Sequence, residues 1–214
     1  MKLELKDISK SYMQGDVSIE VLSRINFKIE ECSSNLILGP SGSGKTTLID
    51  LISLLKSPSN GEIRINGMYT TALSNKESTL LRRREIGIIR QRDNLLPYLN
   101  LLENVNVPQI SSDKKRAAAL LQDIGINELK SCPRKISFFN QQKAALARAL
   151  INTPTIILAD EPTGELNTIE AEKYMELILN NQDKSIILVF SNNSDLKKYF
   201  ENIFYLKNGN LTKR

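Results

Sequence analysis

The sequence predicts an α/β fold on three observations. Two apolar runs without alternation, residues 155–159 and 185–190, are typical of central parallel strands covered on both faces. A helical pattern over residues 168–179 lies between them, so strand and helix alternate in the second half of the chain. Nearer the N-terminus, an apolar run at residues 35–38 ends at a glycine-rich stretch that opens another helical pattern. The 214 residues suit one domain, with room for a subdomain.

The remaining elements follow from periodicity and from turn residues. In the first half we expect strands at residues 3–8, 25–29, 62–65 and 86–89, a helix over residues 45–55 and a break at residues 57–61. The stretch from 101 to about 129 is rich in helical patterns, with Asp113 as a candidate N-cap and Gly125 as a candidate end. An alanine-rich helix is expected over residues 141–150. Residues 203–211 predict a terminal hairpin that turns at Asn208-Gly209.

Composition is that of an ordinary soluble globular protein, with 41% hydrophobic and 25% charged residues. The net charge of +5 is spread along the chain, so it selects no acidic partner, and the arginines at residues 82–84 are expected on a solvated surface or against a permease or an anionic membrane. Cys32 and Cys132 lack metal-ligand spacing and the chain has no His, which argues against a zinc site. No signal peptide or run of about 18 apolar residues is present. Any work at a membrane is therefore expected to need a partner.

A phosphate-binding pattern, G-x-x-x-x-G-K-[ST], follows the apolar run at residues 35–38. It consists of Gly39-Pro40-Ser41-Gly42-Ser43-Gly44-Lys45-Thr46. Glycines let backbone N–H groups converge on phosphate oxygens, and the N-terminus of the next helix adds a favourable dipole. In this pattern Lys45 reaches the β- and γ-phosphates and the Thr46 hydroxyl ligates Mg²⁺. The predicted strand and helix around the pattern favour a Mg-ATP site over a plain turn that caps a helix.

Two acidic residues follow the apolar run at residues 155–159. Asp160 at the strand end can bind Mg²⁺, usually through water, and Glu161 can polarise a water for attack on the γ-phosphate. An apolar strand that ends in two carboxylates is common by itself. Together with the phosphate loop, it predicts the metal-binding and catalytic side of an ATPase site.

With these residues the chain resembles an ABC-transporter ATPase over essentially its whole length, most closely the branch that serves macrolide-export, lipoprotein-release and cell-division permeases. The resemblance lies in the phosphate loop extended to Thr47, a Q-loop region at residues 86–105 and a Walker B segment at residues 158–164. It implies an ABC-type P-loop NTPase with a RecA-like parallel-sheet core, an N-terminal antiparallel β subdomain and a helical subdomain. One domain is expected over residues 1–214, with the helical subdomain at roughly 92–150.

The resemblance implies further roles for single residues. Tyr12 occupies the position of an aromatic ring that stacks on adenine, the alternative being a half-buried tyrosine at a strand edge. Gln91 occupies the position of the Q-loop glutamine, which contacts Mg²⁺ and the attacking water and couples the site to the permease. Thr47 joins the phosphate loop in the expected ATP-binding set.

The chain departs from the family at the signature motif. The family has Leu-Ser-Gly-Gly-Gln, which touches the γ-phosphate held by a second subunit. The aligned stretch here is Ile136-Ser137-Phe138-Phe139-Asn140, and the helix that follows still fits the family. Because glycine permits close backbone approach, Phe138 and Phe139 are expected to impair that contact, unless they turn into a local apolar pocket or a partner surface. Ser137 can still cap the helix.

Further departures concern the switch histidine and the D-loop. The alignment puts Ser191 at the switch position, and a serine reaches less far than imidazole and carries no positive charge. Asn167 stands where the family has a D-loop aspartate, and Cys32 replaces a glycine, which we expect to be tolerated. The signature, switch and D-loop changes fall on the dimeric hydrolytic site, whereas the residues that hold Mg-ATP within one chain are intact.

The sequence therefore predicts the ATP-binding subunit of a membrane ABC transporter, peripheral to the cytoplasmic face of the cell membrane. The expected partners are an integral-membrane permease and a second ATPase subunit, in a homodimer or a heterodimer. Hydrolysis is expected to be slow or asymmetric. The alternative is a regulatory clamp on a membrane complex that binds ATP with little turnover. An ATPase of DNA repair or translation, with nucleic acid as partner, is disfavoured because the long coiled-coil insertion and the tandem second domain are both missing.

Overall fold

The computed structural model describes residues 2–92, 94–111 and 113–213; positions 1, 93, 112 and 214 of the predicted domain lie outside the described residues. One sheet consists of β1 (Leu3–Gln14), β2 (Val17–Ile29), β4 (Asn60–Ile65) and β5 (Met68–Tyr69). The other consists of β3 (Ser33–Leu38), β6 (Ile86–Ile89), β7 (Ile156–Asp160), β8 (Ile186–Ser191), β9 (Asn202–Lys207) and β10 (Asn210–Lys213). The helices are α1 (Lys45–Ile52), α2 (Asn75–Glu85), α3 (Leu101–Asn106), α4 (Lys114–Asp123), α5 (Phe138–Leu150) and α6 (Thr168–Leu179), with 3₁₀ turns η1 (Pro133–Lys135) and η2 (Ser194–Tyr199).

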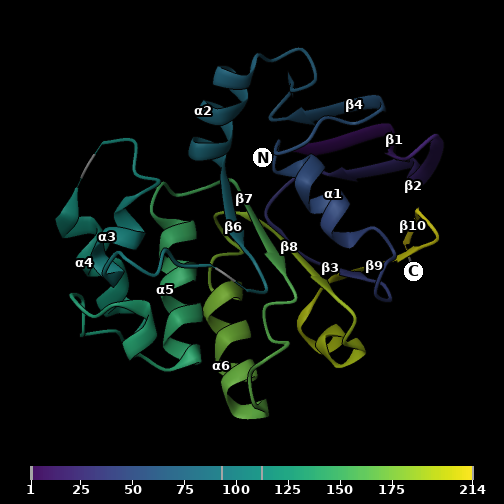
Figure 1. Cartoon of the computed structure of the whole chain (residues 1–214). Helices are drawn as coiled ribbons and strands as arrows, with labels where there is room; N and C mark the ends of the chain where they lie inside the picture. Colours follow the sequence, from purple (N-terminus) through teal and green to yellow (C-terminus); the bar gives the residue numbers. More distant parts are fainter. Residues whose placement is uncertain (1, 93, 112, 214) are drawn as a thin grey trace.

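The two sheets differ in the relative direction of their strands, and α1 lies between them (Figure 1). The first is antiparallel, with strand order β2-β1-β4-β5. The second has the order β10-β9-β3-β8-β7-β6 and is parallel except for the terminal hairpin of β9 and β10. The carboxyl ends of β3, β6 and β7 therefore meet at one edge of this sheet, where ligands bind in open α/β folds.

The central strands explain the apolar runs in the second half of the chain. Along β8, Ile186, Leu188 and Phe190 pack on the side of α1 and the antiparallel sheet. Ile187 and Val189 point to the opposite face, where α6 covers the sheet. Because both faces are buried, every position of β8 before its last residue, Ser191, is apolar, which confirms the prediction of covered parallel strands.

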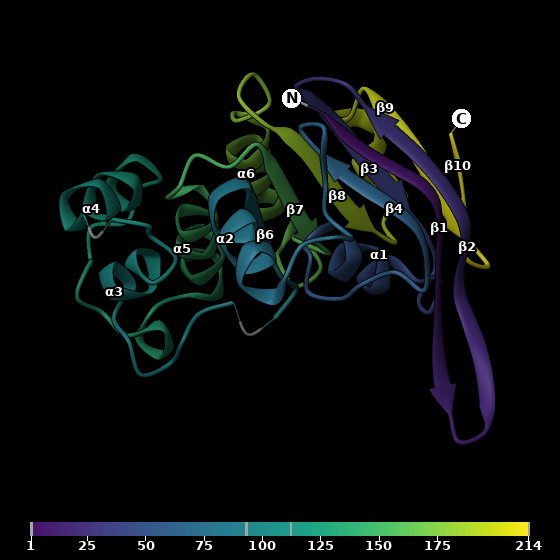
Figure 2. The same ribbon diagram turned by 90° about the horizontal axis from the view of Figure 1, so that it is seen from above.

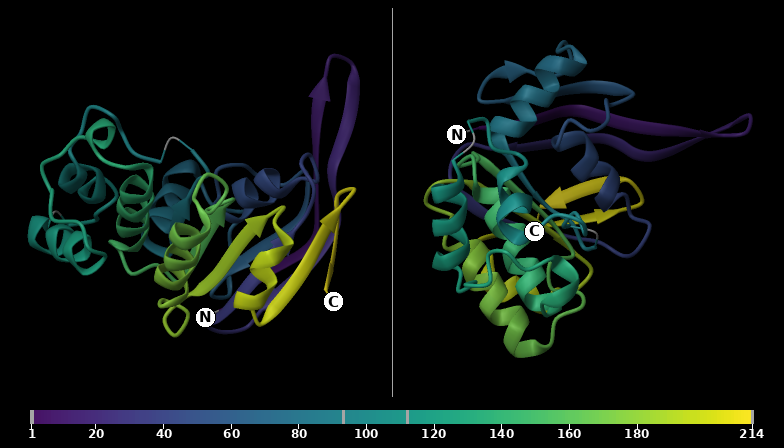
Figure 3. Two further views of the ribbon diagram at one scale, coloured as in Figure 1. Left: turned by 90° about the horizontal axis from the view of Figure 1, so that it is seen from below. Right: turned by 60° about the vertical axis from the view of Figure 1, so that its left-hand side comes forward.

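Helices α3, α4 and α5 pack around a third apolar cluster, at the end of the molecule opposite the hairpin of β1 and β2 (Figures 2 and 3). Asp113 is the N-cap of α4, as predicted, since its carboxylate accepts from the backbone N–H groups of Lys115 (3.0 Å) and Arg116 (3.1 Å). In the described part of the chain, no helix is both long and apolar enough to cross a membrane.

Two elements go beyond the sequence prediction. β1 and β2 extend well past residues 3–8 and 25–29 and form a long hairpin that projects from the body (Figure 2). Bulges interrupt their register, and beyond Ser9 the outer part of β1 pairs with β2 alone among the described strands, so no buried face imposes a pattern there. Helix α2 was not predicted because it has no buried residue and hence no apolar period. It begins instead with a capping box, in which Ser74 and Glu77 bond each other's backbone N–H groups.

Helix boundaries also shift where local backbone signals act. α1 ends at Ile52, earlier than residue 55, and Leu54 adopts a left-handed φ of 57°. α5 begins at Phe138, before the predicted residue 141, because the Ser137 hydroxyl accepts a bond from the Asn140 N–H at 3.2 Å. The proposed capping role of Ser137 is thus seen in the geometry.

Candidate nucleotide-binding site

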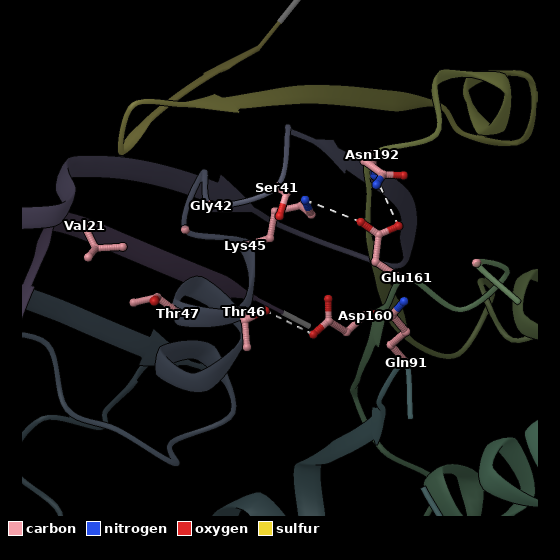
Figure 4. Close-up of a pocket in the computed structure, with 12 residues that line it drawn as sticks. Val21, Ser41, Gly42, Lys45, Thr46, Thr47, Gln91, Asp160, Glu161 and Asn192 are labelled. Carbon is pink, nitrogen blue, oxygen red and sulfur yellow. Dashed lines mark hydrogen bonds and ion pairs between the residues drawn. The ribbon is translucent and has the colours of Figure 1, made fainter. Parts of the chain in front are cut away.

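A pocket of about 520 Å³ opens between the loop before α1, the carboxyl end of β7 and the loop after β6 (Figure 4). It gathers most of the residues that the sequence predicted for ATP and Mg²⁺, namely Ser41, Gly42, Gly44, Lys45, Thr46, Thr47, Gln91, Asp160 and Glu161. Val21, Gly164 and Asn192 also line it, and sequence reasoning did not assign them to the site.

The loop before α1 leaves the first N–H groups of that helix available to a ligand. Gly44 is the N-cap, with φ 101°, and as a glycine it offers no side chain that could cap the helix. Gly39 lies so close to the C-terminal hairpin that a Cβ there would be 2.5 Å from the Leu206 carbonyl oxygen. The Ser43 hydroxyl is buried without a hydrogen-bond partner among the described residues. Free donors at a helix N-terminus are what a phosphate group needs.

Lys45 points across the pocket toward Glu161 (Figure 4). Its ammonium donates to the carbonyl oxygens of Gly39 at 2.7 Å and Pro40 at 3.1 Å, and lies 3.4 Å from Glu161 Oε1. The side chains of Lys45 and Glu161 are only 9% and 13% exposed. A phosphate in the loop would offer this buried ammonium a second counter-ion, so ligand and Glu161 share the same cation.

Glu161 is held from the opposite side by the end of β8. Its Oε2 accepts from the Ser191 hydroxyl at 2.8 Å and from the Asn192 N–H at 3.2 Å. The backbone of Glu161 has a left-handed φ of 43°, which is uncommon for a residue with a side chain. Ser191 therefore contacts the carboxylate directly. Sequence reasoning missed the Asn192 N–H because backbone donors leave no mark in a sequence.

A group of oxygen atoms lies beside this ion pair. The Thr46 hydroxyl donates to Asp160 Oδ2 at 3.4 Å, and Gln91 lines the same side of the pocket (Figure 4). Burial raises the pKa of Asp160, while the positive charge of Arg90 acts in the opposite direction. A hydroxyl, an amide and a carboxylate supply the hard oxygen ligands that Mg²⁺ prefers, so these residues fit the predicted ion.

Tyr12 lies on β1, opposite Ile19, and is not among the residues that line the pocket. Its hydroxyl accepts from the Lys56 ammonium at 3.2 Å, and the ammonium groups of Lys10 and Lys56 lie 5.3 Å and 5.0 Å from the ring centroid. Val21, farther along the paired strand β2, does line the pocket. Tyr12, which the sequence predicted to stack on adenine, therefore lies on the sheet that borders the pocket but does not line the pocket itself.

The degenerate signature residues lie apart from the pocket. Phe139 turns inward, and its ring packs edge-on against Tyr174 with centroids 6.5 Å apart, which is the apolar alternative that the sequence left open. Phe138 lines a separate pocket of about 280 Å³ with Arg92 and Arg134. Asn140 sits in the first turn of α5.

The other two departures from the family's pattern are Asn167 and Cys32. The Asn167 side chain caps α6 by accepting from the Glu170 N–H at 3.0 Å. Cys32 is exposed just before β3. Neither residue lines the nucleotide pocket.

The fold and the pocket define a P-loop nucleotide-binding protein. The chain belongs to the ABC transporter family, whose model matches residues 22–164. The predicted family and the ABC-type fold are therefore confirmed.

Three relatives illustrate the membership. The chain is 38% identical to an uncharacterized ABC transporter ATP-binding protein of Methanocaldococcus jannaschii, MJ0796, over 97% of this chain and 94% of that one. It is 35% identical to the lipoprotein-releasing system ATP-binding protein LolD 1 of Rhodopirellula baltica, over 99% and 96%. It is 37% identical to the macrolide export ATP-binding/permease protein MacB of Bdellovibrio bacteriovorus, over 97% of this chain and 33% of that protein.

A solved structure is similar over nearly the whole chain. It is the dimeric structure of MJ0796 in a post-hydrolysis state with ADP and Pi, with a TM-score of 0.91 and 36% identity. The match covers 99% of this chain and 97% of that one.

Proposed function

We propose that this chain is the ATP-binding subunit of a membrane ABC transporter and couples Mg-ATP binding and slow hydrolysis to a separate permease. The observation that carries the proposal is that one pocket contains both the ion pair of Lys45 with Glu161 and the hydrogen bond of Thr46 to Asp160. These pairs join the phosphate loop to the end of β7, so a triphosphate, its metal ion and a catalytic carboxylate find their partners within one chain.

In the proposed site, each side chain has a defined task. The phosphate loop and Lys45 hold the triphosphate, while Thr46, Asp160 and Gln91 would hold Mg²⁺. The ion, when bound, neutralises charge on the phosphate oxygens. Glu161 accepts a proton from the attacking water. Tyr12 stacks on the adenine base from the neighbouring antiparallel sheet.

The partners are proposed from the relatives. LolD belongs by name to a lipoprotein-releasing system. MacB combines by name an ATP-binding and a permease part, and this chain covers 33% of that whole protein. The proposed partner is a permease on a separate chain, which would hold the subunit at the cytoplasmic face of the membrane. The dimeric state of MJ0796 supports a second ATPase subunit, identical or different.

Slow turnover is proposed because groups that act in the family's hydrolytic dimer are altered. Ser191 is 1% exposed and its hydroxyl bonds Glu161, so it replaces a charged imidazole by one short, neutral donor. Phe138 occupies a position at which the family has a signature glycine that approaches the partner's nucleotide, whereas the ring of Phe139 turns inward onto Tyr174. Losing preorganised donors at such a site lowers the rate by about 10²–10³. A regulatory clamp with little turnover is the limiting case of the same site.

The test compares nucleotide affinity and steady-state ATPase activity of the complex that contains wild-type chain, Lys45→Ala or Glu161→Gln. We expect Lys45→Ala to lose most of the affinity, and Glu161→Gln to bind ATP and lose turnover. Lys198→Ala is the matched control, since that lysine forms an exposed ion pair with Glu172 at the surface. Unchanged affinity in Lys45→Ala would exclude the phosphate-loop assignment. Wild-type turnover near the enzyme median of about 10 per second would exclude both slow hydrolysis and the clamp.

A further inference from the structure

Asp50 is a buried carboxylate on α1 that binds two cations. It is 8% exposed, and its Oδ1 accepts from the Arg90 guanidinium at 2.8 Å, while Oδ2 lies 3.2 Å from the Lys56 ammonium. Asp50 follows Thr46 by four residues, so both lie on the same face of the helix, about 6 Å apart along its axis. The Asp50–Arg90 pair therefore lies one helical turn from the contact of Thr46 with Asp160.

Arg90 is placed beside Asp160 by the sheet itself. It directly follows β6, and β6 pairs in parallel with β7 so that Ile89 lies opposite Ala159. As the first residue after β6, Arg90 thus leaves the sheet close to Asp160, the last residue of β7, since neighbouring strands lie about 4.8 Å apart. Burial raises the pKa of Asp160, and the positive charge of Arg90 opposes this rise.

Two carboxylates, Asp50 and Asp160, therefore lie near the Arg90 guanidinium and compete for it. Arginine has five donors in a planar fork and binds carboxylates strongly, often through two parallel hydrogen bonds. Arg90 bonded to Asp160 would occupy oxygens that a metal ion needs. In the structure Arg90 bonds Asp50 instead, and Asp160 accepts from Thr46.

We propose that Asp50 is a positioning residue that holds Arg90 away from Asp160 and so keeps the Asp160 carboxylate available to Mg²⁺. The inference rests on the proposed role of Asp160 as a metal ligand. It assigns to Asp50 and Arg90 a task in the metal site, although neither lines the nucleotide pocket.

A purely structural role for the pair is the competing explanation. Strand β6 has four residues and is the outer strand of its sheet, so the bond from Arg90 to α1 also anchors the start of the Q-loop. The Arg90 N–H donates to the Asn94 side chain at 2.7 Å in the same segment. If anchoring were the whole role, removing Arg90 alone would lower the gain from Mg²⁺ as removing Asp50 does, because either change breaks the same bond. If Asp50 restrains a competitor of Mg²⁺, removing Arg90 as well restores the site.

The experiment measures the affinity of the full chain for ATP in excess Mg²⁺ and in EDTA, at pH 8, and takes the ratio as the gain due to metal. We expect Asp50→Asn to reduce this gain about 10-fold, the lower end of what second-shell changes do at metal sites. The double variant Asp50→Asn/Arg90→Gln is expected to return to the wild-type ratio. Glu172→Gln, which removes an exposed ion pair with Lys198, is the control and keeps the wild-type ratio.

Two results would overturn the proposal: an unchanged gain in Asp50→Asn, or a double variant that stays as low as the single one. Thermal unfolding of every variant confirms that it is folded. If Asp50→Asn does not fold, Arg90→Gln alone decides, because removal of the competitor must keep the gain at or above the wild-type value and a lower gain refutes the idea. A wild-type chain without any gain from Mg²⁺ would instead remove the metal site of the proposed function itself.

Discussion

Replacing Ser191 with alanine removes one of the two hydrogen bonds that the end of β8 makes to Glu161. The hydroxyl is 1% exposed, donates to Glu161 Oε2 at 2.8 Å and accepts from the Asn193 N–H at 3.1 Å, so its orientation is defined on both sides. The Asn192 N–H and the ion pair with Lys45 remain in the variant. The carboxylate then keeps its place in the pocket but loses its alignment.

The size of the effect follows from that single bond. A hydrogen bond to a charged group contributes about 1.5–3 kcal/mol, and about 1.4 kcal/mol corresponds to a factor of ten in rate. We therefore expect Ser191→Ala to lower kcat about 10- to 100-fold. The affinity for Mg-ATP is expected to stay near the wild-type value, because the hydroxyl bonds Glu161 and the loop that holds phosphate is untouched.

The assay is steady-state kcat and KM of the complex, with nucleotide affinity measured separately. Ser185→Ala is the matched control, since its hydroxyl is also buried beside β8 but donates to the Pro154 carbonyl at 2.7 Å, away from the pocket. Ser191→Thr keeps the hydroxyl and should recover most of the rate. The reasoning fails if Ser191→Ala leaves kcat unchanged, or if affinity falls as much as kcat does.

Three further outcomes are expected. Tyr12→Ala should weaken ATP binding about 10-fold, since stacking on one base contributes about 1–3 kcal/mol. The binding of inorganic triphosphate, measured by the same titration, should stay unchanged, and equal losses for both ligands would contradict base stacking. Because burial raises the pKa of Asp160, the folded state binds that proton more tightly than the unfolded state, so the charge lowers stability at neutral pH and this loss disappears as pH falls through the folded pKa. Asp160→Asn should thus raise the thermal midpoint of the nucleotide-free protein at pH 7, less so at pH 4, and abolish the gain from Mg²⁺; a lower midpoint at pH 7 would count against it. In urea denaturation, Phe139→Gly should destabilise by about 3 kcal/mol, from lost burial and helix propensity. Phe138→Gly should destabilise by about 1 kcal/mol, because Phe138 is half-buried but does not pack on Tyr174; equal losses would show that the inward packing of Phe139 adds nothing.

Much of the fold was readable because buried faces impose periodic patterns. The strand predicted at residues 86–89 is β6, and the helix predicted at residues 168–179 is α6. Helix α2 and the outer hairpin of β1 and β2 escaped prediction because few or none of their side chains are buried, so no apolar period marks them. Their stability comes instead from capping and from strand pairing, which leave weaker signals in a sequence.

In the candidate site the same division holds. Lys45, Thr46, Asp160 and Glu161 were assigned from the sequence because their spacing within short motifs reports a strand end or a helix start. The contact of Ser191 with Glu161 was not predicted, because it spans 30 positions and depends on how β7 and β8 align.

By itself, the sequence determined the family and the elements with a buried face, and it predicted the Mg-ATP site. These features depend on the spacing of residues within short motifs and on the periodic pattern of apolar and polar side chains, and both are properties of the unfolded chain. Only the tertiary structure decided that Phe139 turns inward onto Tyr174, that Ser191 bonds Glu161, and that Asp50 bonds Arg90. The physical reason is that each of these contacts joins residues from different elements, and distances of a few ångströms between such residues exist only once the sheets and helices have packed.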